Sequence, residues 1–239
     1  MITRISLFGL LFATATAAGC KTTDSDGILT RGMYAQISAT ADGAGNTSVG
    51  ATLFLGPPSD LIFVDLEGDD QLIVHHGSES KVMSEQNILG IISHTAVFAS
   101  DRENDAFEVE FRRQVDAGAP SSSVTLPAPF TLGTVPASVS RVDAFGVNWT
   151  GTGTSTDRMR WTAEGSCIQS VSGTISGDPG SVTMPAGTFK KLTGQNIADT
   201  CQVKVTILRE RDGQLDRAFG EGGVATGVQT RSVTFTSAP

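Results

Sequence analysis

The chain has 239 residues, with 17 Lys plus Arg against 25 Asp plus Glu and a net charge of −8. This acidic balance argues against nucleic acid as a partner and against electrostatic attraction to anionic lipid, because both need clustered Lys and Arg. Gly, Ser, Thr, Ala and Val dominate and helix-period stretches are hard to find, a usage typical of short strands joined by turns.

The first 19 residues have the layout of an export signal. Arg4 gives a short positive start, an apolar stretch covers about 5–13, and small residues precede Cys20. The apolar stretch is well short of the roughly 20 residues that a helix needs to cross a bilayer. The segment Ala17-Ala18-Gly19-Cys20 resembles the lipobox of bacterial lipoproteins, although that family most often has Leu where Ala17 stands.

The resemblance implies that residues 1–19 are removed and that Cys20 carries acyl chains, palmitate included, as the new N-terminus. Two or three such chains anchor a protein stably where one holds only marginally. Lys21 after the cysteine, in place of Asp, resembles lipoproteins that are released to the outer membrane. We therefore expect a lipid-anchored envelope protein on the periplasmic or surface face of the outer membrane, with the membrane as its partner. The alternative is an ordinary secretory signal that leaves a free thiol, and such thiols are uncommon in oxidising compartments.

Two further cysteines, Cys167 and Cys201, lie in the body of the chain. In an oxidising envelope we expect them to form a disulfide, the alternative being two buried thiols. A closed loop of about 34 residues would stabilise the fold by roughly 3 to 4 kcal/mol on the chain-entropy model.

The period-two pattern predicts an all-β fold of two tandem β-sandwich, immunoglobulin-like domains after the cleaved signal. Residues 20–29 are expected to be a lipidated tether and 30–114 an N-terminal sandwich. Residues 115–123 are small and lack apolar anchors, so they are expected to be a linker. Residues 124–239 are expected to form the C-terminal sandwich.

Alternation is clear in two places of the N-terminal part. Apolar residues at every second position predict a hairpin over 33–55, with a turn at Asp42-Gly43. Further on, Phe107, Val109 and Phe111 alternate with charged residues and predict a half-buried strand.

The C-terminal part resembles immunoglobulin-like or fibronectin type III sandwiches in its pattern. Trp149 and Trp161 lie in alternating runs and are predicted to be core anchors. In immunoglobulin domains the usual disulfide joins the second and sixth strands, whereas Cys167 follows the third predicted strand, so the resemblance does not extend to a particular family. The predicted strands are 124–131, 141–150, 158–165, 168–176, 181–185, 201–209 and 226–236.

One glycine-rich stretch, residues 213–224, is similar to the core of the bacterial delta-sixty repeat, which has Gly, Leu-Asp, Phe-Gly and Gly-Gly at these relative places. That family carries many tandem copies and is thought to form propeller-like β structures. The chain holds one copy, and a single copy makes no propeller. The simpler interpretation is a long glycine-rich loop between the last two strands.

The motifs of familiar hydrolase, nucleotide and zinc sites are missing, since there is no G-x-S-x-G, P-loop, H-E-x-x-H or paired C-x-x-C. What remains is His75-His76 with His94, near Asp69 and other acidic residues. Adjacent histidines on a strand point to opposite faces, so these two can share a metal only if the strand has ended, as Gly77 would allow. A surface turn is the simpler interpretation, and neither a metal nor a cofactor is expected.

These observations favour an envelope lipoprotein that is a non-catalytic binding or scaffolding module rather than an enzyme, with a protein or glycan partner that the sequence does not name. Recognition is expected in loops at the ends of the second sandwich, at 151–157, 177–180 and 210–225. One alternative is a metal-binding protein or an enzyme that uses His75, His76 and Asp69. Another is an accessory subunit of an envelope complex.

Overall fold

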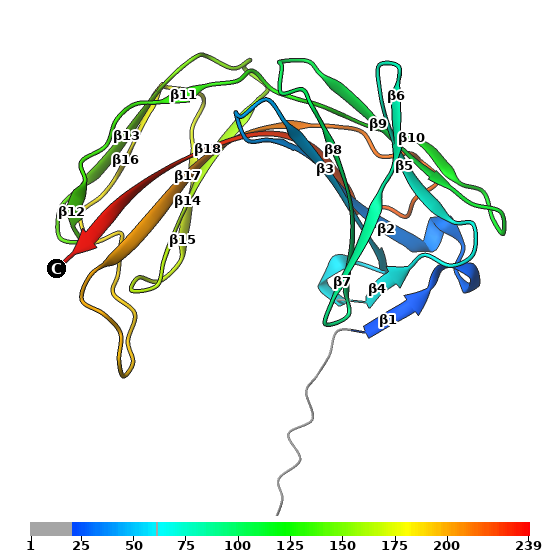
Figure 1. Cartoon of the computed structure of the whole chain (residues 1–239), viewed down its shortest axis with the longest axis horizontal. Coiled ribbons are helices and arrows are strands. Elements are labelled where there is room, and N and C mark those ends of the chain that lie inside the picture. The colour runs from blue at the N-terminus through cyan, green and yellow to red at the C-terminus, as the bar shows by residue number, and fades with distance from the viewer. Residues whose placement is uncertain (1–20, 61) are drawn as a thin grey trace, which may run out of the picture.

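A computed structural model of the chain describes residues 21–239 except residue 61, and it shows an arch of β-strands with a packed body at each end (Figure 1). The expected signal 1–19 and the acylated Cys20 lie outside the described residues. Within these residues, helix is confined to three single turns, η1 (Ser25–Gly27), η2 (Thr30–Gly32) and η3 (Pro58–Asp60). No helix in the described part reaches the length and apolarity that crossing a bilayer requires. The all-β prediction is confirmed.

One eleven-stranded sheet runs through both bodies and lines the inside of the arch (Figure 1). Its main path has the order β1-β4-β3-β2-β18-β17-β14-β15, while β8 pairs with β3, β7 with β8 and β12 with β18. The N-terminal body supplies β1 (Lys21–Asp24), β2 (Met33–Ala41), β3 (Thr47–Leu55), β4 (Ile62–Asp65), β7 (Ser84–Ile88) and β8 (Ile91–Phe98). The C-terminal part supplies β12 (Ser138–Ser140), β14 (Arg158–Gly165), β15 (Val171–Ile175), β17 (Cys201–Asp212) and β18 (Val224–Ala238).

The N-terminal body is a sandwich whose second sheet lies on the outside of the arch. That sheet has the order β10-β9-β5-β6, from β5 (Gln71–His76), β6 (Glu79–Val82), β9 (Ala106–Arg112) and β10 (Ala119–Thr125). The predicted hairpin over 33–55 forms, with Met33 opposite Leu55 and Ala41 opposite Thr47. The predicted alternation in β9 is also confirmed, because Phe107 and Phe111 are both buried in the core.

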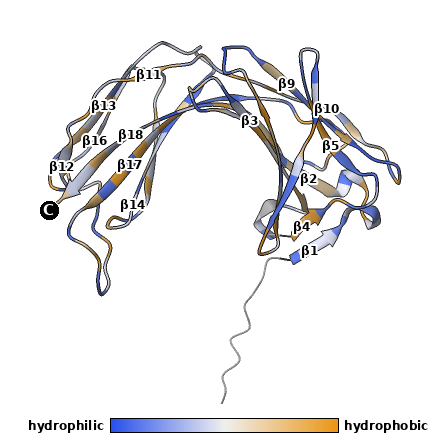
Figure 2. Ribbon diagram, viewed as in Figure 1, coloured by the Kyte–Doolittle hydropathy of each residue, from blue (hydrophilic) through white to orange (hydrophobic). Residues whose placement is uncertain are grey.

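The C-terminal body is a second sandwich, closed on the outside by β11 (Thr131–Leu132), β13 (Phe145–Thr150) and β16 (Ser181–Met184). Trp149 and Trp161 are buried in its core, as predicted. Figure 2 shows hydrophobic and hydrophilic residues alternating along strands such as β17. The sandwich prediction is therefore confirmed for this body.

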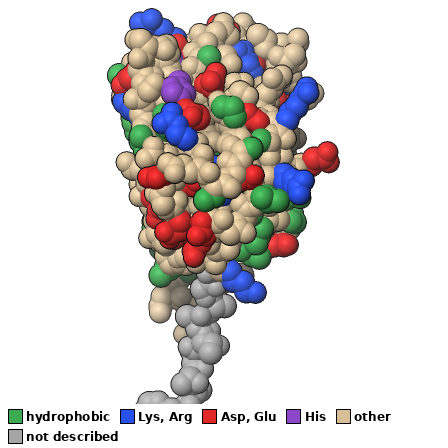
Figure 3. Space-filling view, turned by 90° about the vertical axis from the view of Figure 1, so that its right-hand side faces the viewer, with side chains coloured by type: hydrophobic (Ala, Val, Ile, Leu, Met, Phe, Trp, Pro, Cys, Tyr) green, Lys and Arg blue, Asp and Glu red, His purple; other side chains and the backbone are tan. Residues whose placement is uncertain are grey.

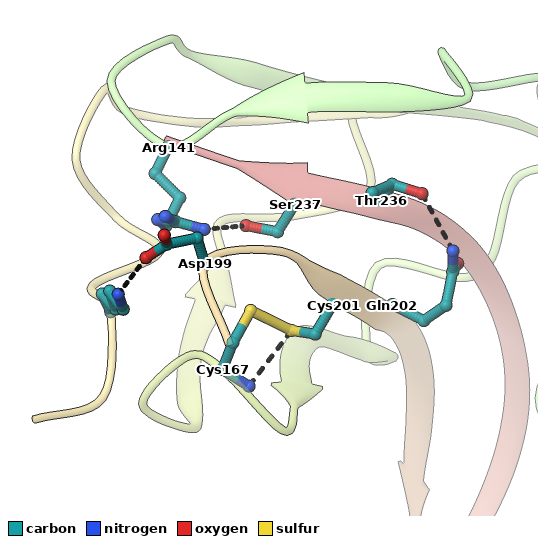
Figure 4. Close-up of a disulfide and its surroundings, with 8 residues drawn as sticks. Arg141, Cys167, Asp199, Cys201, Gln202, Thr236 and Ser237 are labelled. Atoms are coloured by element: carbon teal, nitrogen blue, oxygen red, sulfur yellow. Dashed lines mark hydrogen bonds and ion pairs between the residues drawn. A yellow bond between two sulfur atoms is a disulfide. The ribbon is translucent and has the colours of Figure 1, made fainter. Parts of the chain in front are cut away.

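The predicted disulfide is present between Cys167 and Cys201, whose Cα atoms lie 5.7 Å apart. It ties the start of β17 to the turn that follows β14 (Figure 4). On the neighbouring strand, Arg141 donates a hydrogen bond to the Ser237 hydroxyl. The disulfide therefore closes the far end of the C-terminal body, away from the junction with the N-terminal body.

Two expected segment boundaries are wrong. Residues 21–29, expected to be a tether, begin with β1, which pairs in parallel with β4, and continue into the buried Ser25. Residues 115–123, expected to be a linker, contain most of β10, in which Ser122 is fully buried. Small hydroxyl residues can be buried in such strands because strand pairing satisfies the hydrogen bonds of their backbone. The hydroxyl then needs one partner of its own, and Ser122 Oγ accepts a hydrogen bond from the Asp216 amide.

The two bodies share the long hairpin of β17 and β18. The first half of β18 pairs in parallel with β2, and β17 pairs with β18 along its whole length. The connecting stretch 213–223 is the loop expected between the last two strands, and Phe219 within it is buried in the N-terminal core. Two glycines allow this crossing, because a Cβ would collide with the Thr125 carbonyl at Gly227 and with the Ala35 carbonyl at Gly223.

Candidate functional site: the concave face of the arch

The solvent-facing side of the eleven-stranded sheet forms the inside of the arch (Figure 1). Alternation in β17 and β18 sends every second side chain to this side, because successive residues of a strand face opposite ways. Short hydroxyl side chains dominate the β18 part of it, and Ser232 of β18 and Thr206 of β17 hydrogen-bond across the strand pair at 2.9 Å. On β18 the outward residues after Val228 are Thr230, Ser232, Thr234 and Thr236. The result is a polar surface rich in donors and acceptors.

Where the two bodies meet, this face is hollowed into a groove of about 410 Å³. Strands β2, β3 and β8 of the N-terminal body form one wall, and β14 and β17 form the other. The polar side chains that line the groove include Ser38, Thr52, Thr95, Thr226, Arg160 and Glu210. A second hollow, of about 600 Å³, is lined by residues of β11, β17 and β18 together with the β2–β3 turn.

One ion pair stands in the groove. Arg160 Nε donates a hydrogen bond to the Glu210 carboxylate, and the Arg160 side chain is 45% exposed. A guanidinium has five N–H donors in a planar fork, so Arg160 can hold Glu210 and still donate to a ligand. The groove thus offers hydroxyls, a guanidinium and a carboxylate, a set suited to recognising a polar chain.

Buried ion pairs fix the C-terminal wall of this site. Arg209, fully buried, donates to the carboxylate of Asp178 and to the carbonyls of Ala128 and Gly151. Asp178 also accepts from Trp149 Nε1 at 2.7 Å. Breaking this pair would leave a buried charge and buried carbonyls without hydrogen-bond partners. The pair therefore holds the loops of the C-terminal body in one arrangement.

Arg211 joins the two bodies directly. It donates to both oxygens of Asp157 in the C-terminal body, and to the Asn104 side chain and the Leu126 carbonyl in the N-terminal body. Burial alone would raise the pKa of Asp157, but hydrogen bonds from Arg211 and from the Thr154 amide outweigh it and hold the pKa below its ordinary value. Arg211 therefore ties the two halves of the concave face together.

Acidic side chains of the loops expected to carry recognition take part in these ion pairs. Asp157 of the 151–157 loop and Asp178 of the 177–180 loop are the partners of Arg211 and Arg209. Within 210–225, Phe219 packs against Phe111 of the N-terminal core with ring centroids 5.9 Å apart. No pattern in the sequence singled out the groove, because its Ser, Thr and small apolar residues are common on alternating strands.

The histidines expected as possible metal ligands are not brought together. His75 bonds to Ser80 and to Glu110, while His76, on the other face of β5, stacks on Phe107. Asp69 lies in the turn before β5. Across the part of the chain that the structure describes, no three His, Cys, Asp or Glu side chains gather as a metal site would need.

The third histidine, His94, is buried beside the groove. Its Nε2 lies 3.8 Å from Glu85, and Nδ1 has no hydrogen-bond partner among the described residues. Burial lowers the pKa of His94, although the nearby Asp65 acts in the opposite direction. Burial, with the charges of Asp65 and Glu67, raises the pKa of Glu85. Burial therefore favours the neutral form of His94.

Comparison with known proteins gives a structural likeness and no function. No protein-family model matches the chain, and no curated protein matches it. Among solved structures it is similar to one described as "Crystal structure of DIP-gamma IG1+IG2", with 11% identity over 83% of this chain and 94% of that chain and a TM-score of 0.21.

Proposed function

We propose that the chain is a lipid-anchored binding module of the bacterial outer membrane, held by acyl chains on Cys20, that binds an envelope glycan along the concave face and catalyses no reaction. The observation that carries this proposal is the groove that crosses the junction of two rigidly joined bodies. A ligand that lies along it contacts both bodies at once, which suits an extended chain rather than a small compact molecule.

The chemistry of the face favours a neutral, polyhydroxyl ligand. Hydroxyl side chains both donate and accept hydrogen bonds, and so pair with sugar hydroxyls in either sense. The net charge of −8 disfavours acidic polymers. A rigid site also loses little conformational entropy on binding, which raises the affinity obtained from each contact.

Binding assays with groove variants test this proposal. Purified protein is incubated with peptidoglycan sacculi and with neutral and acidic surface polysaccharides, and the bound fraction is measured by co-sedimentation. We expect Thr226→Arg, which fills the groove, to weaken binding at least about tenfold. Thr183→Arg, the same change on the exposed side of outer strand β16, should bind like the wild type. Equal binding by Thr226→Arg, or no binding of the wild type to any of these glycans, would overturn the proposal.

A further inference from the structure

The hairpin of β7 and β8 ends in an apolar tip that local structure does not explain. Ile88, Leu89 and Ile91 are 64%, 87% and 47% exposed around a two-residue turn at Leu89-Gly90. Leu89 has φ +54, in the left-handed region that such turns usually fill with Asn, Asp or Gly. A leucine there costs backbone energy and exposes apolar surface, so it has no folding role.

This tip lies at the same edge of the arch as the start of the described chain. Ile92, next after the tip, packs against Phe54 and Phe63, and Phe63 is in register with Thr22 of β1. In Figure 1 the end of the β7–β8 hairpin and the first residues of β1 both reach the lower edge. Cys20 directly precedes Lys21 in the sequence.

No flexible tether separates this edge from the cysteine expected to be acylated, because β1 begins at Lys21. Residues 21–24 are already a strand of the large sheet, and Ser25 donates to Asp70 at 2.8 Å. Arg113, with a fully buried side chain, holds the same segment through the Ser25 and Ile28 carbonyls. Acyl chains on Cys20 would therefore hold this edge of the body directly against the bilayer.

We propose that the Ile88–Ile91 tip inserts into the bilayer interface beside the acyl chains, as a second apolar contact that fixes the orientation of the arch. This inference rests on the lipid anchoring in the proposed function. The contact is apolar rather than electrostatic, because acidic side chains, Asp65, Glu67 and Glu85 among them, lie near the hairpin. Figure 3 shows acidic side chains gathered on this end of the arch, above the point where the described chain begins. The tip therefore suits zwitterionic lipid.

The test is depth-dependent quenching of a tryptophan placed in the tip. Leu89→Trp in the acylated full-length mature protein is reconstituted into phosphatidylcholine vesicles that carry brominated acyl chains. The native Trp149 and Trp161 are buried in the C-terminal core and give a constant background. The control is Ser78→Trp, at the tip of the β5–β6 hairpin, which points away from this edge in Figure 1.

We expect the added emission of Leu89→Trp to be quenched at least about twofold and that of Ser78→Trp to be unchanged; Ile88→Trp serves as a second reporter. Vesicle flotation and the mass of the N-terminal peptide report acylation separately. An acylated protein that floats with vesicles but leaves the reporters at positions 88 and 89 unquenched overturns the inference and leaves the anchor intact. A protein without acyl chains refutes both. A blue shift in the added emission of Leu89→Trp that grows with protein concentration in the absence of vesicles assigns the tip to a second copy and also overturns it.

Discussion

The two sandwiches differ in how much of the chain each needs. The core of the C-terminal body comes from residues 130–235 alone, and a disulfide closes it. The N-terminal core comes from residues 33–126 together with Phe219 and Ala225, which arrive almost 100 residues later. The dependence is therefore one-sided. The N-terminal core includes side chains from the last part of the chain, whereas the C-terminal core contains no side chain from the N-terminal body.

Expressing the two bodies as separate fragments should have the largest effect on folding. We expect fragment 127–239 to keep its disulfide and the environment of its two tryptophans, and fragment 21–126 not to fold, because β2 loses its partner β18 and Phe111 loses Phe219. Near-UV circular dichroism and urea titration of both fragments measure this. Cooperative unfolding of fragment 21–126 would contradict the one-sided dependence.

Breaking the buried ion pair should come next. Arg209→Ala leaves Asp178 as a buried charge, so we expect a loss of about 3–5 kcal/mol in the free energy of unfolding. Adding Asp178→Asn should recover part of the loss, because no buried charge then remains. Arg158→Ala removes the exposed pair with Asp212 and should cost less than about 1 kcal/mol. Similar costs for both arginines in urea denaturation would show that the Arg209–Asp178 pair does not fix the loops of the C-terminal body.

Removing the disulfide tests whether the shared hairpin couples the bodies. Cys167→Ala with Cys201→Ala should lower the free energy of unfolding by about 3–4 kcal/mol, since it opens a 34-residue loop. Tryptophan fluorescence reports the C-terminal body, and amide exchange of β2 reports the N-terminal body. We expect both to lose protection together, because β17 and β18 run through both. Loss confined to the tryptophans would mean that the bodies unfold separately.

Much of the fold is readable from local pattern. Strand 158–165 has the predicted bounds, the 33–55 hairpin has the predicted faces, and the two tryptophans lie in the core, because alternation reports directly which side of a strand is buried. The disulfide was predictable because an exported chain with two cysteines in its body is expected to oxidise them to a single bond. The anchor at Cys20 and the outer-membrane location stay predictions.

What the sequence could not supply is which distant strands pair. Residues 119–125 look like a linker because serine replaces the apolar half of the pattern, yet Ser122 is buried under the 213–223 loop and bonds to Asp216. The parallel pairing of β18 with β2 joins residues almost 190 positions apart, and no local period encodes it. The groove arises from that pairing, so its Ser and Thr residues carry no signal of their own.

The smallest expected effect concerns the N-terminal body at mildly acidic pH. Burial lowers the pKa of His94, so the folded state holds His94 neutral while the unfolded chain takes up a proton as pH falls through about 6.5. The stability due to neutral His94 is therefore present above that pH and lost below it. Glu85, whose pKa is raised, acts in the opposite sense, since its contribution is present at low pH and lost as pH rises.

Comparing variants isolates the histidine from the carboxylate. We expect the melting temperature of the wild type to fall from pH 7.5 to 5.5, and His94→Gln, which cannot be protonated there, to fall less. His75→Gln is the matched control, because the His75 side chain is 35% exposed and bonds to Glu110 at the surface. Thermal unfolding at four or five pH values measures the slopes. If His94→Gln and the wild type have the same slope, protonation of His94 does not limit the N-terminal body, and the acid sensitivity lies in its carboxylates or in the ion pairs of the junction.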